Sequence, residues 1–196
     1  MNKDILICGV GGQGTILASK ILAGSAMKSG NPVHTAETIG MSQRGGSVTS
    51  HIRIGDSAFS PLIPLGGADM ILSFEPSEAV RCLPYLKKEG IVITNTVPTR
   101  PVTESLRPTG YDGTEMLSYL QSKCTCIPVD GAKACSEFHS MKFLNIVLLG
   151  VAAGTGRLEL EKDIFLQEIE NRVPERFREN NLAAFRKGFE LSGSKF

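Results

Sequence analysis

The feature that most constrains this chain is a cluster of glycines between a short apolar run and a helical pattern. Residues 5–10 are apolar apart from Gly9, which is typical of a strand buried on both faces. Gly11, Gly12 and Gly14 follow directly. From residue 15 to 29 apolar side chains recur at helical spacing, until a Ser-Gly-Asn-Pro sequence ends the pattern. A strand, a glycine turn and a helix in this order predict the opening unit of an α/β fold.

The rest of the chain predicts further strands and helices in alternation. Strands are expected at residues 33–38, 48–54, 68–74, 91–95 and 124–129, and helices at 75–86, 116–121, 134–153, 161–172 and 177–191. We expect Pro84 to shorten the first of these helices, and residues 95–111, rich in proline, to form a surface excursion. About ten residues without a helical pattern join strands 33–38 and 48–54, and a parallel return needs a dozen or more. This pair is therefore expected to be antiparallel.

These elements predict a three-layer, Rossmann-like α/β/α fold with a mostly parallel, mixed sheet and C-terminal helices. The length of 196 residues, with 41% hydrophobic and 21% charged residues, is that of an ordinary globular chain. We expect residues 1–196 to form a single domain, with a helical C-terminal part at about 134–192.

Charge and composition exclude several classes of protein. The 21 cations and 20 anions leave a net charge of +1, whereas a nucleic-acid binder usually has a basic excess. The longest nearly apolar run, residues 143–153, is too short to span a membrane. No signal-peptide pattern is evident at the N-terminus, so a cytoplasmic location is expected.

Metal and histidine chemistry have little support in the sequence. Five cysteines are scattered, and the only close pair, Cys124 and Cys126, has no second pair to complete a metal site or a four-cysteine cluster. The three histidines lack ligand spacing. Glu75 and Glu78 stand at a predicted helix start, where carboxylates interact favourably with the helix dipole, so we expect a structural role for them.

The glycine turn at residues 9–14 has two interpretations. Glycines allow close backbone approach to a ligand, and a helix N-terminus attracts anions, so the turn fits a phosphate cradle. Glu37 follows at a distance compatible with a ribose contact, which leaves an NAD site open. Alternatively, the glycines only close the turn between strand and helix.

A second glycine loop spans residues 40–47 and carries one cation, Arg44, among hydrogen-bonding side chains. Such a loop is able to place a guanidinium and backbone amides around an anion. A solvated hairpin loop is the alternative.

Both loops together resemble the gamma domain of the 2-oxoacid:ferredoxin oxidoreductases, and the form of the second loop is most similar to the indolepyruvate-specific members. The resemblance extends over most of the chain and includes the stretches 51–55 and 74–79, together with Arg81, Asn95, Asn145 and Gly150. It assigns ligand- or cofactor-side contacts to the two loops, at Gly9, Gly11, Gly12, Gln13, Gly14, Ser42, Gln43, Arg44, Gly45 and Gly46.

The resemblance also implies a division of labour within a complex. A larger alpha subunit is expected to carry thiamine diphosphate and the iron–sulfur clusters, to use coenzyme A as co-substrate and to reduce ferredoxin. The present chain is expected to carry no catalytic residue and no cofactor alone, and to be inactive without its partner. The alternatives that remain are a gamma subunit for another 2-oxoacid, a free-standing NAD-binding domain, and an interaction subunit whose loops only shape an interface.

Overall fold

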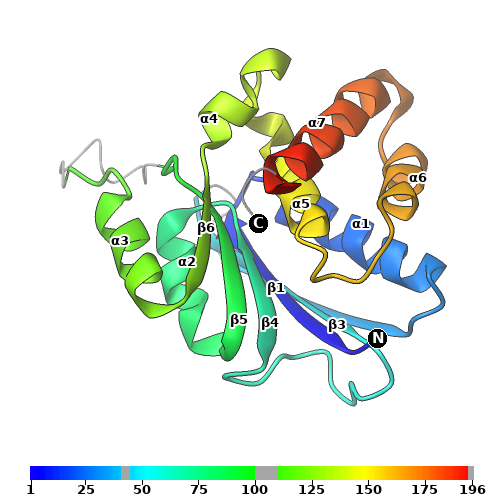
Figure 1. Ribbon diagram of the computed structural model, residues 1–196, viewed down its shortest axis with the longest axis horizontal. Coiled ribbons are helices and arrows are strands. Elements are labelled where there is room, and N and C mark those ends of the chain that lie inside the picture. Colours follow the sequence, from blue (N-terminus) through cyan, green and yellow to red (C-terminus); the bar gives the residue numbers. More distant parts are fainter. Residues whose placement is uncertain (41–44, 100–109, 194–196) are drawn as a thin grey trace.

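The chain folds around one six-stranded sheet in the order β2-β3-β1-β4-β5-β6 (Figure 1). The computed structural model describes residues 1–40, 45–99 and 110–193. The strands are β1 (Lys3–Val10), β2 (Val33–Ile39), β3 (Ser47–Ile54), β4 (Ala68–Ser73), β5 (Leu86–Asn95) and β6 (Thr125–Val129). The α-helices are α1 (Thr15–Lys28), α2 (Pro76–Cys82), α3 (Thr114–Lys123), α4 (Gly131–Ala134), α5 (Leu144–Gly154), α6 (Lys162–Arg172) and α7 (Glu175–Gly193).

The sheet is mixed because β3 runs against all the other strands. β3 pairs antiparallel with both β1 and β2, while β1, β4, β5 and β6 form parallel pairs. The antiparallel pairing of β2 and β3, predicted from their short connection, is confirmed. As a result β3 lies between β1 and β2, so the two strands joined by α1 are not neighbours in the sheet.

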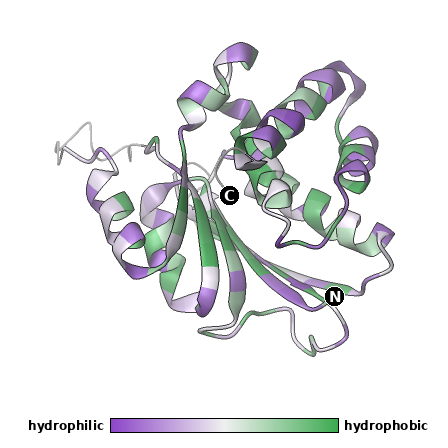
Figure 2. Cartoon of the chain, viewed as in Figure 1, coloured by the Kyte–Doolittle hydropathy of each residue, from purple (hydrophilic) through white to green (hydrophobic). Residues whose placement is uncertain are grey.

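Helices cover both faces of the sheet, which confirms the predicted α/β/α layering. On one face α2 and α3 enclose a small core that includes Leu6, Ile71 and Val92. On the other face α1 and α5 pack on the strands, and α6 and α7 pack outside them over the larger core. Figure 2 shows the resulting hydropathy pattern, with apolar strands and α5 inside and polar outer faces on α6 and α7.

Helix α5 is buried on every side, and glycines bring it close to α7. A Cβ atom on Gly150 would collide with the carbonyl oxygen of Phe185, and one on Gly188 with that of Val147. Residues 144–153 are all buried between the sheet and α7. Among the described residues no helix is long and apolar enough to cross a bilayer.

Two predicted helices differ from the structure. The helix expected at 75–86 ends at Cys82, a 3-10 turn at Leu83–Tyr85 follows, and Leu86 begins β5. Pro84 lies in that turn, where its missing N–H and fixed φ end the α-helix. The helix expected at 134–153 is broken, because His139 adopts a left-handed conformation with φ 50° and Ser140 is extended. Most of the predicted excursion at 95–111 lies outside the described residues.

Candidate functional site

The candidate site lies at the carboxyl end of the parallel strands, where the chain reverses its direction of winding. After β1 the chain crosses through α1 toward β2, and after β4 it crosses through α2 toward β5, on the opposite side. The carboxyl ends of β1 and β4, which are paired neighbours, therefore form the switch point of the sheet. Open α/β sheets bind their ligands in the crevice at this position.

The glycines of the 9–14 turn are required for two different reasons. Gly12 and Gly14 have φ of 100° and 80°, a left-handed region that is costly for other residues. A Cβ on Gly14 would also collide with the amide of Asn145, whereas one on Gly12 would meet nothing within 4 Å. Gly9 has no such φ, but its Cβ would lie 2.6 Å from Oε1 of Gln13 and 3.2 Å from Cβ of Phe74.

Part of the turn's backbone is already used within the protein. The N–H of Gly11 donates to the carbonyl oxygen of Gly46 at 2.8 Å, and the N–H of Gln13 donates to that of Val10 at 3.2 Å. These two amides are therefore not available to cradle a phosphate. Any anion at this turn has to be bound by the remaining amides and the first turn of α1, which has no side-chain cap.

The Gln13 side chain holds the turn against two neighbouring segments. Its Oε1 accepts a hydrogen bond from the N–H of Val10 at 2.8 Å. Its Nε2 donates to the carbonyl oxygen of Phe74 at 3.1 Å and to Oγ1 of Thr99 at 2.9 Å. The side chain that the sequence placed among the ligand contacts thus has an evident structural role.

The second glycine loop begins and ends beside the first. Gly40 donates its N–H to the carbonyl oxygen of Ser47 at 2.9 Å, and the Gly11–Gly46 bond joins the two loops directly. The structure therefore brings Gly45 and Gly46 next to the 9–14 turn. Ser42, Gln43 and Arg44, the other predicted site residues, lie outside the described residues.

Two buried acids support the same edge of the sheet. Oε2 of Glu78 accepts a hydrogen bond from Oγ of Ser47 at 2.5 Å, and Nε of Arg81 lies 3.3 Å from its Oε1. Glu75, only 1% exposed, caps α2 by accepting from the backbone N–H groups of Ser77 and Glu78. The structural role expected for these acids is therefore observed, and Glu78 in addition holds the end of the second loop.

Tyr111 completes the environment of Glu75. Its hydroxyl donates to Oε1 of Glu75 at 2.6 Å. Burial raises the pKa of Tyr111 well above its usual value, and the neighbouring carboxylate raises it further. The phenol therefore stays protonated and acts as a hydrogen-bond donor. Sequence analysis did not identify this residue, because no spacing rule connects it to Glu75.

A pocket of about 380 Å³ opens beside the glycine turn. Its lining residues come from the turn, from the segment after β5 and from the segment before α5: Gly12, Gln13, Asn95, Val97, Pro98, Thr99, Met141, Lys142 and Leu144. Lys142 brings a cation to the turn, and the apolar walls are supplied by Val97, Met141 and Leu144. Sequence analysis missed Lys142 because the predicted continuous helix at 134–153 concealed its position in a separate turn.

Asn95 fixes the far wall of this pocket. Its Nδ2 donates to the carbonyl oxygen of Val97 at 2.7 Å, and its Oδ1 accepts from the N–H groups of Val97 and Gly131. The side chain thereby determines how the chain leaves β5.

The cysteines do not converge on a metal site in the described part of the chain, where no three His, Cys, Asp or Glu residues form a group suited to a metal ion. Burial raises the pKa of Cys126 to about 12 and that of Cys135 to about 11. Both are therefore neutral thiols at neutral pH. All five cysteines lie in the described part of the chain, and no three of them come together there.

The topology separates Glu37 from the glycine turn. Glu37 lies on β2, and β3 intervenes between β2 and β1. Two strand spacings amount to about 9.5 Å, so Glu37 does not occupy the position of a ribose-binding acid on the strand next to β1.

Comparison with known proteins agrees with this arrangement. Residues 4–191 match the family model described as pyruvate ferredoxin/flavodoxin oxidoreductase. The chain belongs to this family.

Several relatives of the pyruvate ferredoxin/flavodoxin oxidoreductase family are similar over nearly their whole length. Indolepyruvate oxidoreductase subunit IorB of Methanothermobacter thermautotrophicus is 40% identical, with 96% of this chain and 97% of that protein covered. The subunit of the same name from Pyrococcus horikoshii is 37% identical, with 96% and 95% covered. The pyruvate/ketoisovalerate oxidoreductases common subunit gamma of Pyrococcus furiosus is 30% identical, with 95% of both covered.

Solved structures share the fold of this family member. A keto/oxoacid ferredoxin oxidoreductase gamma subunit from Geobacter sulfurreducens has a TM-score of 0.71 at 23% identity, covering 98% of this chain and 99% of its own. A 2-oxoglutarate:ferredoxin oxidoreductase from Magnetococcus marinus has a TM-score of 0.76 at 17% identity. All of the present chain matches 32% of that longer chain.

Proposed function

We propose that this chain is the non-cofactor-carrying subunit of an indolepyruvate:ferredoxin oxidoreductase. The complex would oxidatively decarboxylate an arylpyruvate with coenzyme A, giving an aryl-acetyl-CoA, CO₂ and reduced ferredoxin. The observation that carries the proposal is the identity of 35–40% with four IorB subunits over nearly full length. The common gamma subunits, which serve other oxoacids, reach only about 30%.

The partner in this proposal is a larger alpha subunit that holds thiamine diphosphate and the iron–sulfur clusters. Bound there, thiamine diphosphate supplies the carbanion chemistry of decarboxylation and the clusters transfer electrons. We place the single domain, residues 1–196, in the cytoplasm with its partner.

The glycine turn and the adjoining pocket form the ligand side of this subunit. Lys142 and the first turn of α1 are suited to a phosphate group, and the apolar wall of the pocket to an adenine or pantetheine segment. Gly9, Gly11, Gln13, Gly14 and Asn95 shape the edge through their packing and hydrogen bonds, and Gly12, which has open space beside it, lets the backbone approach a ligand. Gly45, Gly46 and the undescribed Ser42, Gln43 and Arg44 complete the proposed set.

The experiment is reconstitution under anaerobic conditions. The chain is assayed alone and together with its co-expressed partner, with indolepyruvate, coenzyme A, thiamine diphosphate and an artificial electron acceptor. We expect turnover only when both subunits are present. Turnover by the isolated chain, or a pyruvate preference in the reconstituted complex, would contradict the proposal.

The ligand side is tested separately by two pairs of variants. Arg44→Lys keeps the charge but loses the bidentate fork, and Arg44→Ala loses both. If the fork binds an anion, both variants raise the KM for coenzyme A to a similar extent. Lys142→Gln should raise the same KM, whereas Lys88→Gln, at the opposite end of the sheet, should leave it unchanged. If both Arg44→Lys and Arg44→Ala have normal kinetics, Arg44 is not part of the site. If Lys142→Gln has normal kinetics, Lys142 is not part of the site.

A further inference from the structure

Strand β2 is an open edge of the sheet that lacks the usual protection against further pairing. Within Val33–Ile39 there is no proline and no lysine, and its pairing with β3 runs without a bulge. Most of its side chains are exposed, and Ile39 is 57% exposed. Natural proteins usually blunt such an edge with proline, lysine or a bulge, and the opposite edge strand, β6, carries Pro128.

The backbone groups that β2 offers follow from its register with β3. Gly40 donates its N–H to Ser47, and Gly55 donates to Pro32, so these pairs are hydrogen-bonded pairs. Because hydrogen-bonded and non-hydrogen-bonded pairs alternate, the even-numbered residues of β2 bond to β3. The N–H and C=O groups of Val33, Thr35, Glu37 and Ile39 therefore point away from β3, along the open edge.

We propose that β2 pairs antiparallel with β2 of a second copy of this chain, with the two-fold axis at Ala36. In this register all seven residues of β2 are paired. Each residue whose backbone groups point along the open edge lies opposite another such residue of the second copy. Val33 lies opposite Ile39 of the second copy, which buries both apolar side chains. Thr35 lies opposite Glu37, and the small Ala36 meets its own copy, where the strands approach most closely.

Charge selects this register over its neighbours. A two-fold axis at Glu37 would place two carboxylates directly opposite each other, which destabilises a sheet. An axis at Thr35 pairs only Val33 to Glu37 and leaves Ile39 uncovered. With the axis at Ala36 the two Glu37 side chains are only diagonal neighbours, about 7–8 Å apart. Lys20 of α1 lines the same pocket as Glu37 and offsets their repulsion.

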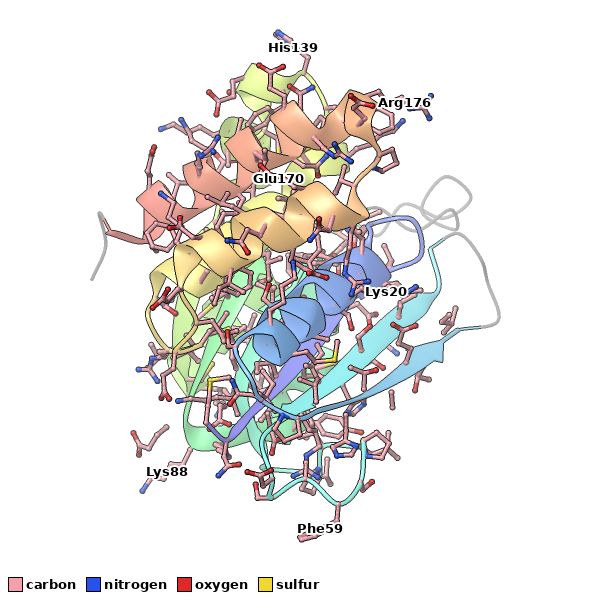
Figure 3. All side chains as sticks on the ribbon, turned by 90° about the vertical axis from the view of Figure 1, so that its right-hand side faces the viewer. Lys20, Phe59, Lys88, His139, Glu170 and Arg176 are labelled. Atoms are coloured by element: carbon pink, nitrogen blue, oxygen red, sulfur yellow. The ribbon has the colours of Figure 1, made fainter. Side chains whose placement is uncertain are left out.

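Surrounding elements leave room for this pairing. Figure 3 looks onto the side of the molecule where β2 forms the sheet edge, with Lys20 of α1 beside the strand. Pocket-lining residues Ala23, Met27 and Val33 lie on the same side, and Met27 is 53% exposed. Dimerisation would bring these apolar groups of the two copies toward each other. It would also join the two six-stranded sheets into one continuous twelve-stranded sheet.

The decisive test uses opposite charges at the two-fold axis. We expect purified wild-type chain to sediment with about twice the monomer mass at high micromolar concentration. Ala36→Lys and Ala36→Glu each place like charges opposite each other, and each should raise the dissociation constant at least about tenfold. Mixing the two variants should restore a dimer that contains one chain of each. Thr38 lies on the same strand and face as Ala36, but in this register it lies opposite His34 of the second copy and not opposite itself. Thr38→Lys therefore places no two lysines opposite each other, and this variant should still dimerise.

A cross-linking experiment checks the register independently. Ala36→Cys would bring two cysteines together at about 4.5 Å between Cα atoms, within the range for a disulfide. Mild oxidation should give a covalent dimer for Ala36→Cys and none for Thr38→Cys or wild type. A monomeric wild type at all concentrations, or like-charge variants that remain dimeric, would overturn the proposal. Neither outcome depends on the enzyme activity proposed above.

Discussion

The two ends of the sheet are held in different ways. At the carboxyl end, the 9–14 turn depends on glycine backbone geometry, on backbone amides that bond to Val10 and Gly46, and on the uncharged side chain of Gln13. At the other end, the loop of residues 55–67 is held by side chains of β3. Arg53 donates to the carbonyl oxygen of Ser60 at 3.0 Å and pairs with Asp4, and Nδ1 of His51 accepts from the N–H of Ile63 at 3.1 Å.

This difference separates two kinds of sensitivity. A glycine turn has no titrating group, but it does not tolerate a side chain. The 55–67 loop is exposed at its tip, and its attachment depends on the neutral imidazole of His51 and on the guanidinium of Arg53. Substitutions in the 9–14 turn should therefore destabilise the protein through steric clash and backbone strain. Changes at the 55–67 loop should act through lost charge interactions and should depend on pH.

Gly14→Ala should have the largest effect. The left-handed φ costs about 1–2 kcal/mol, and collision with the buried Asn145 adds a similar amount, so we expect a loss of about 2–4 kcal/mol in unfolding free energy. Gly12→Ala is the matched control, because it has the same strain with open space around its Cβ. Urea denaturation should give a loss of about 1–2 kcal/mol for this control. Equal losses would show that the Asn145 contact is unimportant.

Removal of the Arg53 side chain should rank second. Arg53→Met keeps much of the apolar stem but leaves the largely buried Asp4 without its ion pair and frees the carbonyl oxygen of Ser60. Hydrogen bonds to charged groups contribute about 1.5–3 kcal/mol, so we expect a loss of that order. Limited proteolysis should show faster cleavage within 55–67 and unchanged protection of the carboxyl end. Uniform loss of protection would indicate that the two ends are not independent.

His51 should make the second end dependent on pH. Burial lowers the pKa of His51, and its Nδ1 must be unprotonated to accept the bond from Ile63. The unfolded chain therefore binds a proton more readily than the folded chain, so stability is complete above about pH 6.5 and falls as the pH is lowered. The slope from this group is at most about 1.4 kcal/mol per pH unit.

Thermal denaturation between pH 7.5 and 5 measures this effect. His51→Gln should be less stable at pH 7.5 but should lose most of the slope between pH 6.5 and 5. The exposed His34 serves as the control, and His34→Gln should retain the wild-type slope. An unchanged slope in His51→Gln would assign the pH dependence to another group.

The smallest effect is expected at the loop tip. Phe59 is 96% exposed and points away from the body of the protein at the lower edge of Figure 3. Phe59→Ser should change the unfolding free energy by no more than about 0.5 kcal/mol. Ile63→Ser, at a buried position of the same loop, should be clearly destabilising in the same denaturation experiment. A large effect of Phe59→Ser would mean that the tip contributes to folding.

The parts of the fold that follow from local patterns were predictable. The apolar run of β1, the glycine turn and the spacing of α1 are all local signals, and the ten-residue connection was enough to make β3 antiparallel. The broken segment before α5 was not predictable, because the break depends on the left-handed conformation of His139, which composition does not indicate. Leu86 was assigned to a helix because its apolar character fits either structure, and only its pairing with Ala68 makes it a strand residue.

The residues of the candidate site were also predictable only where they are close together in the sequence. The glycines of the 9–14 turn were predicted because a turn between a strand and a helix depends on residues that are adjacent in the sequence. Lys142 and Tyr111 join the region from distant parts of the chain, and Gln13 turned inward because Phe74 and Thr99 happen to offer acceptors there. Such long-range contacts arise from tertiary packing and have no signature in a single sequence.

The close contact of α5 with α7 has a consequence for the synthesis of the chain. α5 emerges from the ribosome before α7, and a chain grows at about 5–20 residues per second. Until Glu175–Gly193 are available, the face of α5 that carries Gly150 and Gly154 is not covered by α7, although every residue of α5 except Asn145 is apolar or glycine. The chain from Gly154 to Gly193 takes about two to eight seconds to synthesise, and during this interval α5 is exposed to chaperones and to other nascent chains.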